Sequence, residues 1–291
     1  MLQIEVVGAG VVGQALGSAL QKHAFPVHFV DVDERKVEQL RQQGQQAFLP
    51  SESVTAAAAA DVFFLSVPTP TINSSADYNF IVQAARMVGE KLRTRAEYAV
   101  VIVKSTVLPG TTEQLIIPAL EQASQKKAGA DFGVCVCPEY LREKHAAQDA
   151  EAPRVTLIGE YDTRSGDVVA SIFARFDAPV VRTTLRSAEF QKLIHNLYNA
   201  VKISFFNEMR AFTQIAMPEI DAQTAFEVTA ISSEGMWNPL YGTRDWGPFG
   251  AACLPKDVAA FCTWAENLPA HSELVLAAMH LNERLQNQVR P

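Results

Sequence analysis

The sequence predicts an α/β protein in which a Rossmann-type, doubly wound parallel sheet is followed by a smaller all-helical domain with a long central helix. Three features of the chain carry this prediction. Short β-rich apolar runs alternate with amphipathic helical patterns as far as Thr184, as strands joined by crossover helices do. A glycine-rich turn links the first run to the first helical pattern. From Ser187 a helical pattern continues for about thirty residues without glycine or proline.

The expected elements of the first domain follow one another regularly. Strand segments read IEVVGAG, PVHFVDVD, ADVFFLSVP, AEYAVVIVKST, FGVCVCPE, RVTLIGE and PVVRTT, and helical patterns cover residues 11–23, 34–43, 78–92, 111–123 and 163–176. Beyond the long helix, helical segments continue and are interrupted by a loop over residues 232–254. We therefore expect a dinucleotide-binding Rossmann domain over residues 1–185 and a helical domain over residues 186–291.

Composition limits the classes of partner. The chain has 291 residues, of which 48% are apolar, and a formal net charge of −7. A negative net charge gives no general field that would attract nucleic acid or an acidic membrane surface. The apolar stretch VTAAAAADVFFLSVP is interrupted by Asp61 and closed by Pro68, so no membrane span is expected. Because no basic leader precedes MLQIEVVGAG, we expect a cytoplasmic location.

Four cysteines lie at positions 135, 137, 253 and 262. Their spacing is neither that of a zinc site nor that of a secreted disulfide framework, so no metal is expected. Cys135 and Cys137 alternate within one strand and would share a buried face. Cys253 precedes Pro255, which suits a first helical turn, so its thiol would lie near free N–H groups that favour a thiolate. Cys262 would lie within the apolar body of that helix.

The glycine-rich turn reads Gly8-Ala9-Gly10-Val11-Val12-Gly13 and stands between a strand and a helix. Asp31 ends the next strand, where dinucleotide-binding proteins carry the acid that binds the ribose hydroxyls, about 20 residues further on. Glycines let the backbone approach a pyrophosphate, and the helix start offers N–H donors to it. An acid here repels a 2′-phosphate, which favours NAD over NADP. A bare strand-to-helix turn with a solvated aspartate, or a flavin site, stays open as an alternative.

Two polar pairs in the second domain share a spacing of four residues. Lys192 and Asn196 project from one face of the long helix and could together donate to a substrate oxyanion. Cys253 and Asp257 repeat the spacing. The alternative for Lys192 is a solvated residue at the rim of the helix. Beside it runs an apolar stripe that we expect to pack in the core: Leu193, Ile194, Leu197, Val201 and Phe205.

Six segments in order resemble the UDP-glucose/GDP-mannose dehydrogenase family, whose NAD-dependent members oxidise the primary alcohol of a sugar twice, to a carboxylate. They are GAGVVG with Asp31, VPTPTINSSAD, KSTVLPGTT, CPEYLREKHAAQD, SAEFQKLIHNLYNAVKISFFNE and CLPKD. The resemblance implies NAD as the cofactor and a helical domain that serves dimerisation and catalysis. It also implies a homodimer, because the family's counterpart of the long helix lies at a subunit interface.

The resemblance further implies residue roles. Cys253 would be the nucleophile, and the other catalytic positions would be Lys192, Asn196, Asp257, Thr106, Glu139 and Glu143. The positions implied in cofactor binding are Gly8, Gly10, Val11, Val12, Gly13, Asp31, Lys36, Val67, Pro68, Thr69, Ser105, Thr106, Glu143 and Lys256.

These roles fit a four-electron oxidation. A base or an ordered water would remove the hydroxyl proton during the first hydride transfer. The Cys253 thiolate would add to the aldehyde, and the resulting thiohemiacetal would lose the second hydride to leave a thioester. Asp257 or Glu143 would assist hydrolysis through water, while Lys192 and Asn196 would stabilise the oxyanion.

Two departures from the family bear on the substrate. The family carries a further C-terminal α/β domain that holds the nucleotide, whereas this sequence stops at Pro291. The family's GFGGSC reads GPFGAAC here, with Pro248, Ala251 and Ala252 in place of smaller or polar groups. We therefore expect a shortened enzyme that acts on a small primary alcohol or aldehyde, or on a substrate presented by a carrier, rather than on a nucleotide-sugar.

Two other functions stay open from the sequence. A two-electron dehydrogenase of the 3-hydroxyacid type also combines this fold with a lysine and an asparagine four residues apart, and Cys253 would then be structural. A non-catalytic, NAD-binding regulatory or scaffold protein would keep the fold without the chemistry. The yield of NADH per substrate tests the first alternative, and the labelling rate of Cys253 relative to Cys262 tests the second.

Overall fold

The computed structural model describes residues 2–56, 60–243, 247–250, 253–266, 268, 270 and 272–289, apart from the side chains at 54–56, 143, 253 and 289. The chain forms two compact units, Met1–His195 and Asn196–Pro291. The long helix α8 (Leu185–Ala216) contributes residues to both of them.

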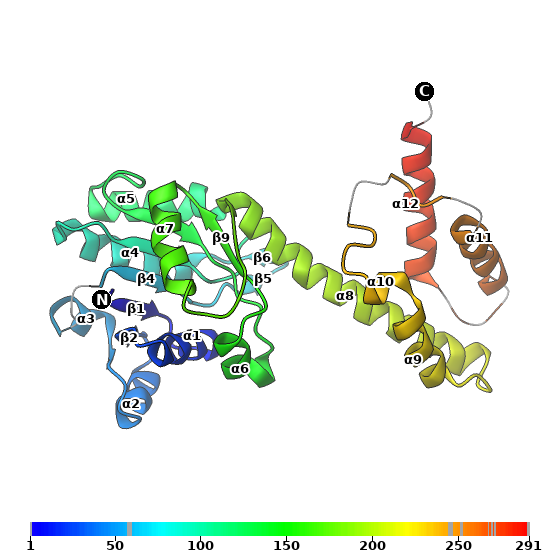
Figure 1. Cartoon of the computed structure of the whole chain (residues 1–291), viewed down its shortest axis with the longest axis horizontal. Coiled ribbons are helices and arrows are strands. Elements are labelled where there is room, and N and C mark those ends of the chain that lie inside the picture. The colour runs from blue at the N-terminus through cyan, green and yellow to red at the C-terminus, as the bar shows by residue number, and fades with distance from the viewer. Residues whose placement is uncertain are drawn as a thin grey trace. The chain divides into compact units, whose positions relative to one another are not determined.

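The first unit is built on a central sheet (Figure 1), to which eight of the described strands contribute in the order β10-β9-β8-β7-β4-β1-β2-β3. β1 pairs in parallel with β2 and β4, so that Val7 lies opposite both Val30 and Leu65. The carboxyl ends of these three strands therefore meet at one edge of the sheet. The strands are β1 (Ile4–Val7), β2 (Val27–Val30), β3 (Ala47–Phe48), β4 (Val62–Leu65), β7 (Val100–Val103), β8 (Gly133–Val136), β9 (Thr156–Glu160) and β10 (Val180–Thr184).

The sheet departs from parallel pairing at β8 and β9, which run antiparallel with Cys135 opposite Glu160. A 3-10 turn (Glu143–His145) and the short helix α6 (Ala146–Glu151) join these two strands. α6 packs against α1 (Val11–Lys22). Because this connection is not a crossover along the sheet, the chain enters β9 from the opposite end. β10 then pairs in parallel with β9.

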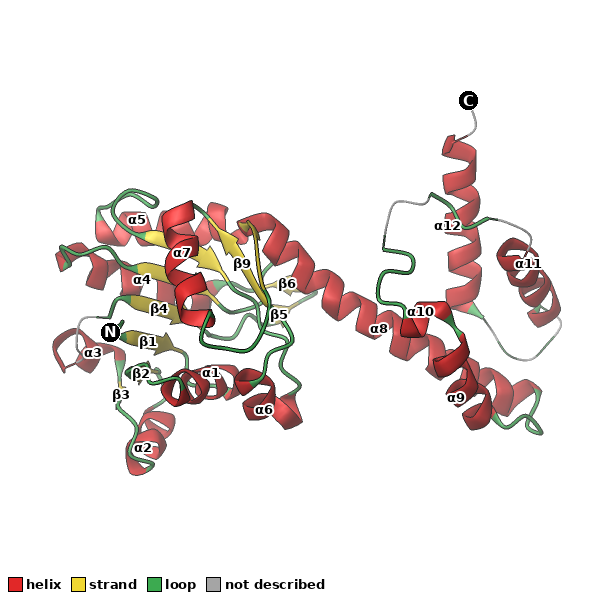
Figure 2. Ribbon diagram, viewed as in Figure 1, coloured by secondary structure: helices red, strands yellow, loops and turns green. Residues whose placement is uncertain are grey.

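Helices cover both faces of the sheet (Figure 2). Phe64 and Phe63 are 0% and 2% exposed on opposite faces, in two separate apolar cores. Burial of both faces explains why the strand segments read as continuous apolar runs. Cys135 and Cys137 lie buried in the same core, as predicted. α1, α2 (Glu34–Gln42) and α7 (Thr163–Phe173) contribute to that core, and α4 (Asn79–Thr94) and α5 (Ile117–Ser124) to the other.

Three smaller elements complete the first unit. A two-stranded antiparallel hairpin follows β4 and consists of β5 (Thr71–Ile72) and β6 (Ser75–Ala76). The helix α3 (Pro50–Ala56) lies between β3 and β4 in the chain. A π-helical turn, η1 (Thr112–Ile116), leads directly into α5.

The second unit is helical and has a small aromatic core. Phe212 of α8 is 2% exposed, and its ring centroid lies 5.3 Å from that of Phe261 and 5.5 Å from that of Trp264. The other helices are α9 (Ala222–Ser232), α10 (Glu234–Trp237), α11 (Cys253–Ala265) and α12 (Glu273–Val289). In the part of the chain that the structure describes, none of the helices has the length and apolarity that a membrane crossing requires.

The apolar stripe of α8 does not pack in the core of this chain. Ile194, Leu197 and Val201 are 47%, 61% and 55% exposed. The prediction that these residues are core is therefore wrong for the single chain. Helical periodicity identifies an apolar face, but it does not say what covers that face.

Candidate active site

Two glycines of the turn between β1 and α1, Gly8 and Gly13, cannot be replaced by a larger residue. Gly8 has φ +97°, and a Cβ there would lie 2.5 Å from the carbonyl oxygen of Ser66. A Cβ on Gly13 would lie 1.9 Å from the carbonyl oxygen of Gly8. Gly10 is the N-cap of α1 and provides no side chain to satisfy the first N–H groups of the helix. The turn therefore presents backbone donors at a helix start, as a pyrophosphate requires.

Asp31 is held beside this turn at the end of β2. Its carboxylate is 8% exposed and accepts hydrogen bonds from the backbone N–H groups of Ala9, at 2.7 Å, and Asp33, at 2.9 Å. The Lys36 ammonium lies 3.6 Å from the same carboxylate. Each carboxylate oxygen accepts one backbone hydrogen bond, which leaves lone pairs for the two hydroxyls of a ribose.

A cavity of about 300 Å³ opens at the carboxyl ends of β1, β2, β4 and β7. It brings together most of the residues predicted to bind a cofactor. The lining residues are Gly8, Gly10, Val11, Val12, Asp31, Lys36, Ser66, Val67, Pro68, Thr69, Lys104, Ser105, Thr106 and Glu139. A glycine cradle that a Cβ would fill and an oriented acid in one cavity suit an NAD molecule.

Hydroxyl groups join the loops that form one wall of this cavity. The Thr69 hydroxyl donates to the carbonyl oxygen of Thr106 at 2.7 Å, and the Ser105 hydroxyl donates to that of Val67 at 2.6 Å. The loops after β4 and β7 are thereby fixed to each other. Because both hydroxyl protons are used in these bonds, the two side chains act by holding the backbone of the wall in place.

Three predicted cofactor residues lie elsewhere or cannot be placed. Gly13 is buried within α1, where it permits the tight turn rather than lining the cavity. Lys256 belongs to the second unit, is exposed and pairs with Asp257 at 2.7 Å. The side chain of Glu143 lies outside what the structure describes.

Lys192 is buried rather than solvated at a rim. It is 5% exposed, and its Nζ lies 3.3 Å from a carboxylate oxygen of Glu139. Glu139 follows β8 and lines the cavity, as does Thr106. The solvated alternative for Lys192 is therefore wrong. Three of the predicted catalytic residues lie in the first unit: Thr106 and Glu139 line the cavity, and Lys192 contacts Glu139.

The other predicted catalytic residues belong to the second unit. Asn196 is exposed on α8, one turn beyond Lys192. α11 begins at Cys253, and not after it as predicted, so Asp257 lies in the second turn of this helix. Pro255 falls in the first turn, where its missing N–H has no intrahelical partner to lose. The Cys253 side chain and residues Ala251 and Ala252 lie outside the described residues.

The other three cysteines are buried. Burial raises the pKa of Cys135 to about 12 and also raises the pKa of Cys137 and of Cys262. Thiols with raised pKa values stay protonated at neutral pH and are weak nucleophiles. The predicted inert character of these three residues is consistent with their positions.

The structure adds two cavity residues that sequence reasoning missed, Ser66 and Lys104. Lys104 is 8% exposed, and its ammonium donates to the carbonyl oxygen of Pro138 at 3.1 Å. Its signal was present in the sequence, since a lysine directly after an apolar strand is seldom buried without a purpose. Lys104 therefore ties the end of β7 to the segment that carries Glu139.

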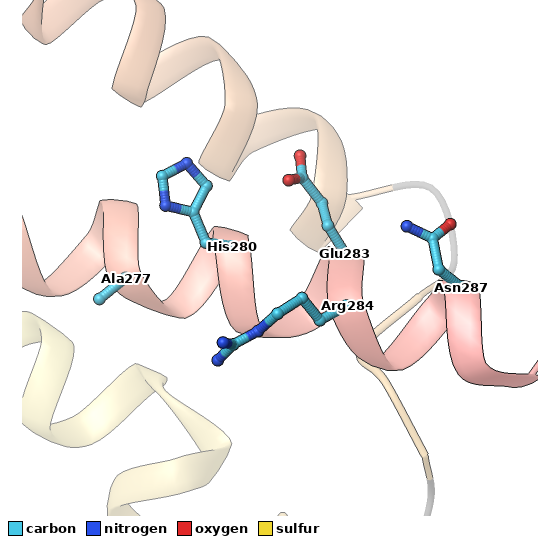
Figure 3. A pocket seen from close by; sticks show the side chains of 5 residues that line it. All are labelled: Ala277, His280, Glu283, Arg284 and Asn287. Carbon is cyan, nitrogen blue, oxygen red and sulfur yellow. The ribbon is translucent and has the colours of Figure 1, made fainter.

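A second hollow lies along α12 in the second unit (Figure 3) and is lined by Ala277, His280, Glu283, Arg284 and Asn287. All five residues come from one helix, and none of them was predicted to act. Within the described ranges, no three His, Cys, Asp or Glu side chains come together as a metal site. We therefore assign no role to this hollow.

The Rossmann unit and its cavity define a dinucleotide-dependent oxidoreductase. Comparison with known proteins makes the assignment specific. The sequence pattern described as "UDP-glucose/GDP-mannose dehydrogenase family, NAD binding domain" matches residues 43–177, and the pattern of the family's central domain matches residues 186–284. A pattern described as "NADP oxidoreductase coenzyme F420-dependent" matches residues 3–79.

Curated relatives and solved structures agree with this. GDP-mannose 6-dehydrogenase of Azotobacter vinelandii is 34% identical over 97% of this chain and 68% of its own length. The crystal structure of GDP-mannose dehydrogenase from Pseudomonas aeruginosa has a TM-score of 0.90 and 32% identity, covering 99% of this chain and 70% of that one. A UDP-glucose dehydrogenase from Pyrobaculum islandicum has a TM-score of 0.73 and 30% identity, covering 98% and 68%.

This chain belongs to the UDP-glucose/GDP-mannose dehydrogenase family. It is an NAD-dependent dehydrogenase that acts on a CH–OH group, and the resemblance seen in the sequence is confirmed. The assignment removes the flavin alternative and the non-catalytic alternative. The chain spans about two thirds of the length of these relatives.

Proposed function

We propose that this protein oxidises a primary alcohol to a carboxylate in two steps, with Cys253 as the nucleophile. The observation that carries the proposal is the ion pair between buried Lys192 and partly exposed Glu139, at the wall of the cavity that Asp31 and Thr106 also line. A buried cation at a cofactor cavity is suited to stabilise negative charge that develops on a substrate oxygen.

The first step turns the alcohol into an aldehyde. NAD in the cavity supplies the hydride acceptor. The residues of this chain orient the alcohol and remove its proton, either to Glu139 or to a water held by Thr106 and Glu139. Lys192 lowers the barrier by stabilising the alkoxide.

The second step needs a nucleophile, because an aldehyde must first become a tetrahedral adduct before it can lose a hydride. α11 begins at Cys253, and a helix start favours the thiolate over the thiol. The thiolate adds to the aldehyde carbon, and the thiohemiacetal becomes a thioester by losing its hydroxyl proton and a hydride, which a second NAD would accept. Water then releases the carboxylate and returns the sulfur as a thiolate. Asn196 assists Lys192 at the oxyanion, and Asp257 or Glu143 takes a proton from the attacking water.

For the substrate we propose a primary alcohol smaller than a nucleotide-sugar, or one presented by a carrier. The sequence before Cys253 supports this, since Pro248 and Ala251 add carbon atoms where the family pattern GFGGSC has glycine, and Ala252 lacks the hydroxyl of its serine. GDP-mannose and UDP-glucose, which name the relatives, are the substrates to compare against it.

We also propose that two copies of the chain associate through α8. The support is the exposed apolar stripe that includes Ile194, Leu197 and Val201, since apolar faces of this kind are usually covered. Light scattering of the purified protein should give twice the mass of one chain. A monomeric mass at micromolar concentration would contradict this part of the proposal.

The test of the reaction counts NADH. Purified protein is incubated with NAD and a panel of small primary alcohols, aldehydes, sugar phosphates, GDP-mannose and UDP-glucose, and the intact mass is recorded. Wild type should yield two NADH per alcohol and a transient thioester adduct. Cys253→Ala should lose the adduct and the second NADH, whereas the matched control Cys262→Ala should behave as wild type.

Two outcomes would overturn parts of this proposal. One NADH per alcohol, undiminished in Cys253→Ala, would assign the protein to the two-electron, 3-hydroxyacid type. Efficient turnover of GDP-mannose or UDP-glucose, with none of the small alcohols oxidised, would contradict the proposed substrate but keep the mechanism.

A further inference from the structure

Tyr140 faces the buried Lys192 with its aromatic ring, and its hydroxyl is bound elsewhere. It directly follows Glu139 in the loop after β8. The Lys192 ammonium lies 5.4 Å from the centroid of the Tyr140 ring, and the ring of His195 lies 5.0 Å from it. The Tyr140 hydroxyl donates a hydrogen bond to the side-chain oxygen of Gln191. All of these residues belong to the first unit.

These contacts show which groups compensate the Lys192 ammonium inside the protein. A buried ammonium loses its hydration and has to be compensated by fixed partners. Glu139 provides one such partner at 3.3 Å, and the face of the Tyr140 ring provides a second. Glu139 also lines the cavity, where a bound substrate would compete for that carboxylate. The aromatic ring is the partner that remains.

We propose that Tyr140 is a positioning residue for Lys192, holding its ammonium charged and aimed at the reacting oxygen. The hydroxyl fixes the ring to α8 through Gln191, one residue before the lysine that the ring supports. This inference rests on the proposed function only in that Lys192 is taken to stabilise the oxyanion. The support of a cation by the ring is a property of the protein alone.

The other ionisable groups around Lys192 are compatible with this role. Burial lowers the pKa of His195, and the neighbouring Lys192 cation lowers it further. His195 is therefore neutral at pH 7 and adds no second positive charge. Burial is the largest cause that raises the pKa of Tyr140, and the nearby Cys137 and Glu139 raise it further. The hydroxyl therefore stays protonated and remains a donor to Gln191. Glu139 is the anion that faces Lys192 directly.

The test measures the pKa of Lys192 itself, so it requires no turnover. Lysines are labelled competitively with an amine reagent over a pH series, and the Lys192 peptide is quantified by mass spectrometry. Tyr140→Leu should lower the pKa of Lys192 by about half to one unit, because the apolar side chain keeps water out without replacing the ring. Tyr140→Met, whose longer and more flexible side chain adapts to the space of the ring, is measured in parallel in case Tyr140→Leu fails to fold.

Two further variants separate positioning from packing. Tyr140→Phe keeps the ring but loses the hydrogen bond to Gln191, so it should lower the pKa of Lys192 by less than Tyr140→Leu does. The matched control is Tyr98→Leu, since Tyr98 also lies under a cation, Arg164 at 3.5 Å, but precedes β7 at the end of the sheet away from the cavity. This control should leave both the pKa of Lys192 and kcat unchanged.

Turnover supplies the second measurement. Tyr140→Leu should lower kcat for the first NADH by about three- to tenfold with little change in KM for NAD. An unchanged Lys192 pKa in both Tyr140→Leu and Tyr140→Met would overturn the inference, whatever the reaction turns out to be. A lowered pKa with unchanged kcat would instead contradict the proposed role of Lys192 in the reaction.

Discussion

The carboxylate of Asp31 accepts a hydrogen bond of 2.7 Å from the backbone N–H of Ala9. This contact joins the end of β2 to the glycine turn after β1, which are separate parts of the dinucleotide fingerprint in the sequence. The acid that would bind the ribose is thus oriented by the turn that would bind the pyrophosphate. The ribose-binding acid and the pyrophosphate-binding turn are therefore already bonded to each other in the absence of a cofactor.

The first prediction concerns NAD affinity. Asp31→Ala should weaken NAD binding by about 100-fold, since hydrogen bonds to a charged acceptor are worth about 1.5–3 kcal/mol each. Asp33→Ala is the control, because Asp33 caps α2 through Arg35 but does not line the cavity. It should leave the NAD Kd within about twofold and cost about 1 kcal/mol of unfolding free energy. Titration calorimetry measures both; equal affinity of Asp31→Ala and wild type would sink the assignment of this acid.

The second prediction concerns the choice between NAD and NADP. Lys36 lies 3.6 Å from the Asp31 carboxylate. Removing that carboxylate in Asp31→Asn removes the repulsion of a 2′-phosphate and leaves Lys36 available to attract it. The ratio of NAD to NADP in kcat/KM should fall by at least about tenfold. The double variant Asp31→Asn with Lys36→Ala should lose most of the gain in kcat/KM for NADP. An unchanged ratio in Asp31→Asn alone would mean that the charge of Asp31 does not set the preference for NAD.

The third prediction concerns Glu189, which is 1% exposed in the first turns of α8. Its carboxylate accepts from the backbone N–H groups of Gly110, at 2.5 Å, and Thr112, at 2.9 Å. Glu189→Ala would leave both donors buried at the start of η1, and we expect a loss of about 3 kcal/mol in the free energy of unfolding. Urea denaturation followed by circular dichroism measures this loss.

The control for that experiment lies on the same two elements. Glu113 of η1 pairs with Arg186 of α8, and their side chains are 35% and 60% exposed. Glu113→Ala should therefore cost no more than about 1 kcal/mol. Equal losses in the two variants would mean that the buried carboxylate is not what fixes α8 to the loop after β7.

The sequence predicted those parts of the fold that depend on local pattern. Every strand of the central sheet except the short β3 lies within a predicted apolar run. The runs are clearest for β1, β2, β4, β7 and β8, which are buried along their whole length. The antiparallel entry of β9 was not predicted. The direction of a strand depends on whether the segment before it crosses back along the sheet. Here that segment includes α6, which packs on α1, and β9 runs antiparallel to β8. The periodicity of residues 143–156 carries no information about that.

The site shows the same division. Gly8, Gly13 and Asp31 could be recognised because their spacing follows from the turn they form. The role of Tyr140 could not, and Lys104 offered only its place directly after an apolar strand, since both roles arise from the packing of the loops after β7 and β8 and of α8. The role of Cys253 came from family resemblance together with the position of a helix start, and remains a prediction.

The fourth prediction concerns the Lys192–Glu139 pair. Lys192→Ala should lower kcat for the first NADH by about 100- to 1,000-fold, as the loss of an oxyanion donor does elsewhere. Lys192→Arg should recover only part of this activity, because a planar guanidinium does not fit the space of an ammonium. Lys127→Ala, whose lysine is 75% exposed, is the control and should retain wild-type kcat. Retention of more than about a tenth of kcat in Lys192→Ala would contradict its role.

The fifth prediction concerns thiol reactivity and its pH dependence. Burial raises the pKa of Cys135 to about 12, against an ordinary value of 9.0, and also raises the pKa of Cys137 and Cys262. A raised pKa keeps a thiol protonated, so these three residues should stay almost unlabelled by iodoacetamide between pH 7 and 9. Cys253, at the start of α11, should label fastest and reach its limiting rate at a lower pH than a free thiol.

Peptide mass spectrometry after timed labelling of the native protein reads out each cysteine separately. Labelling in urea is the reference, since unfolding removes the burial that raises the three pKa values and all four cysteines should then react alike. Saturating NAD should change the rate at Cys253 alone if the thiol faces the reacting carbon. Native labelling of Cys253 no faster than that of Cys262 would mean that the helix start does not activate this thiol, and the four-electron mechanism would lose its nucleophile.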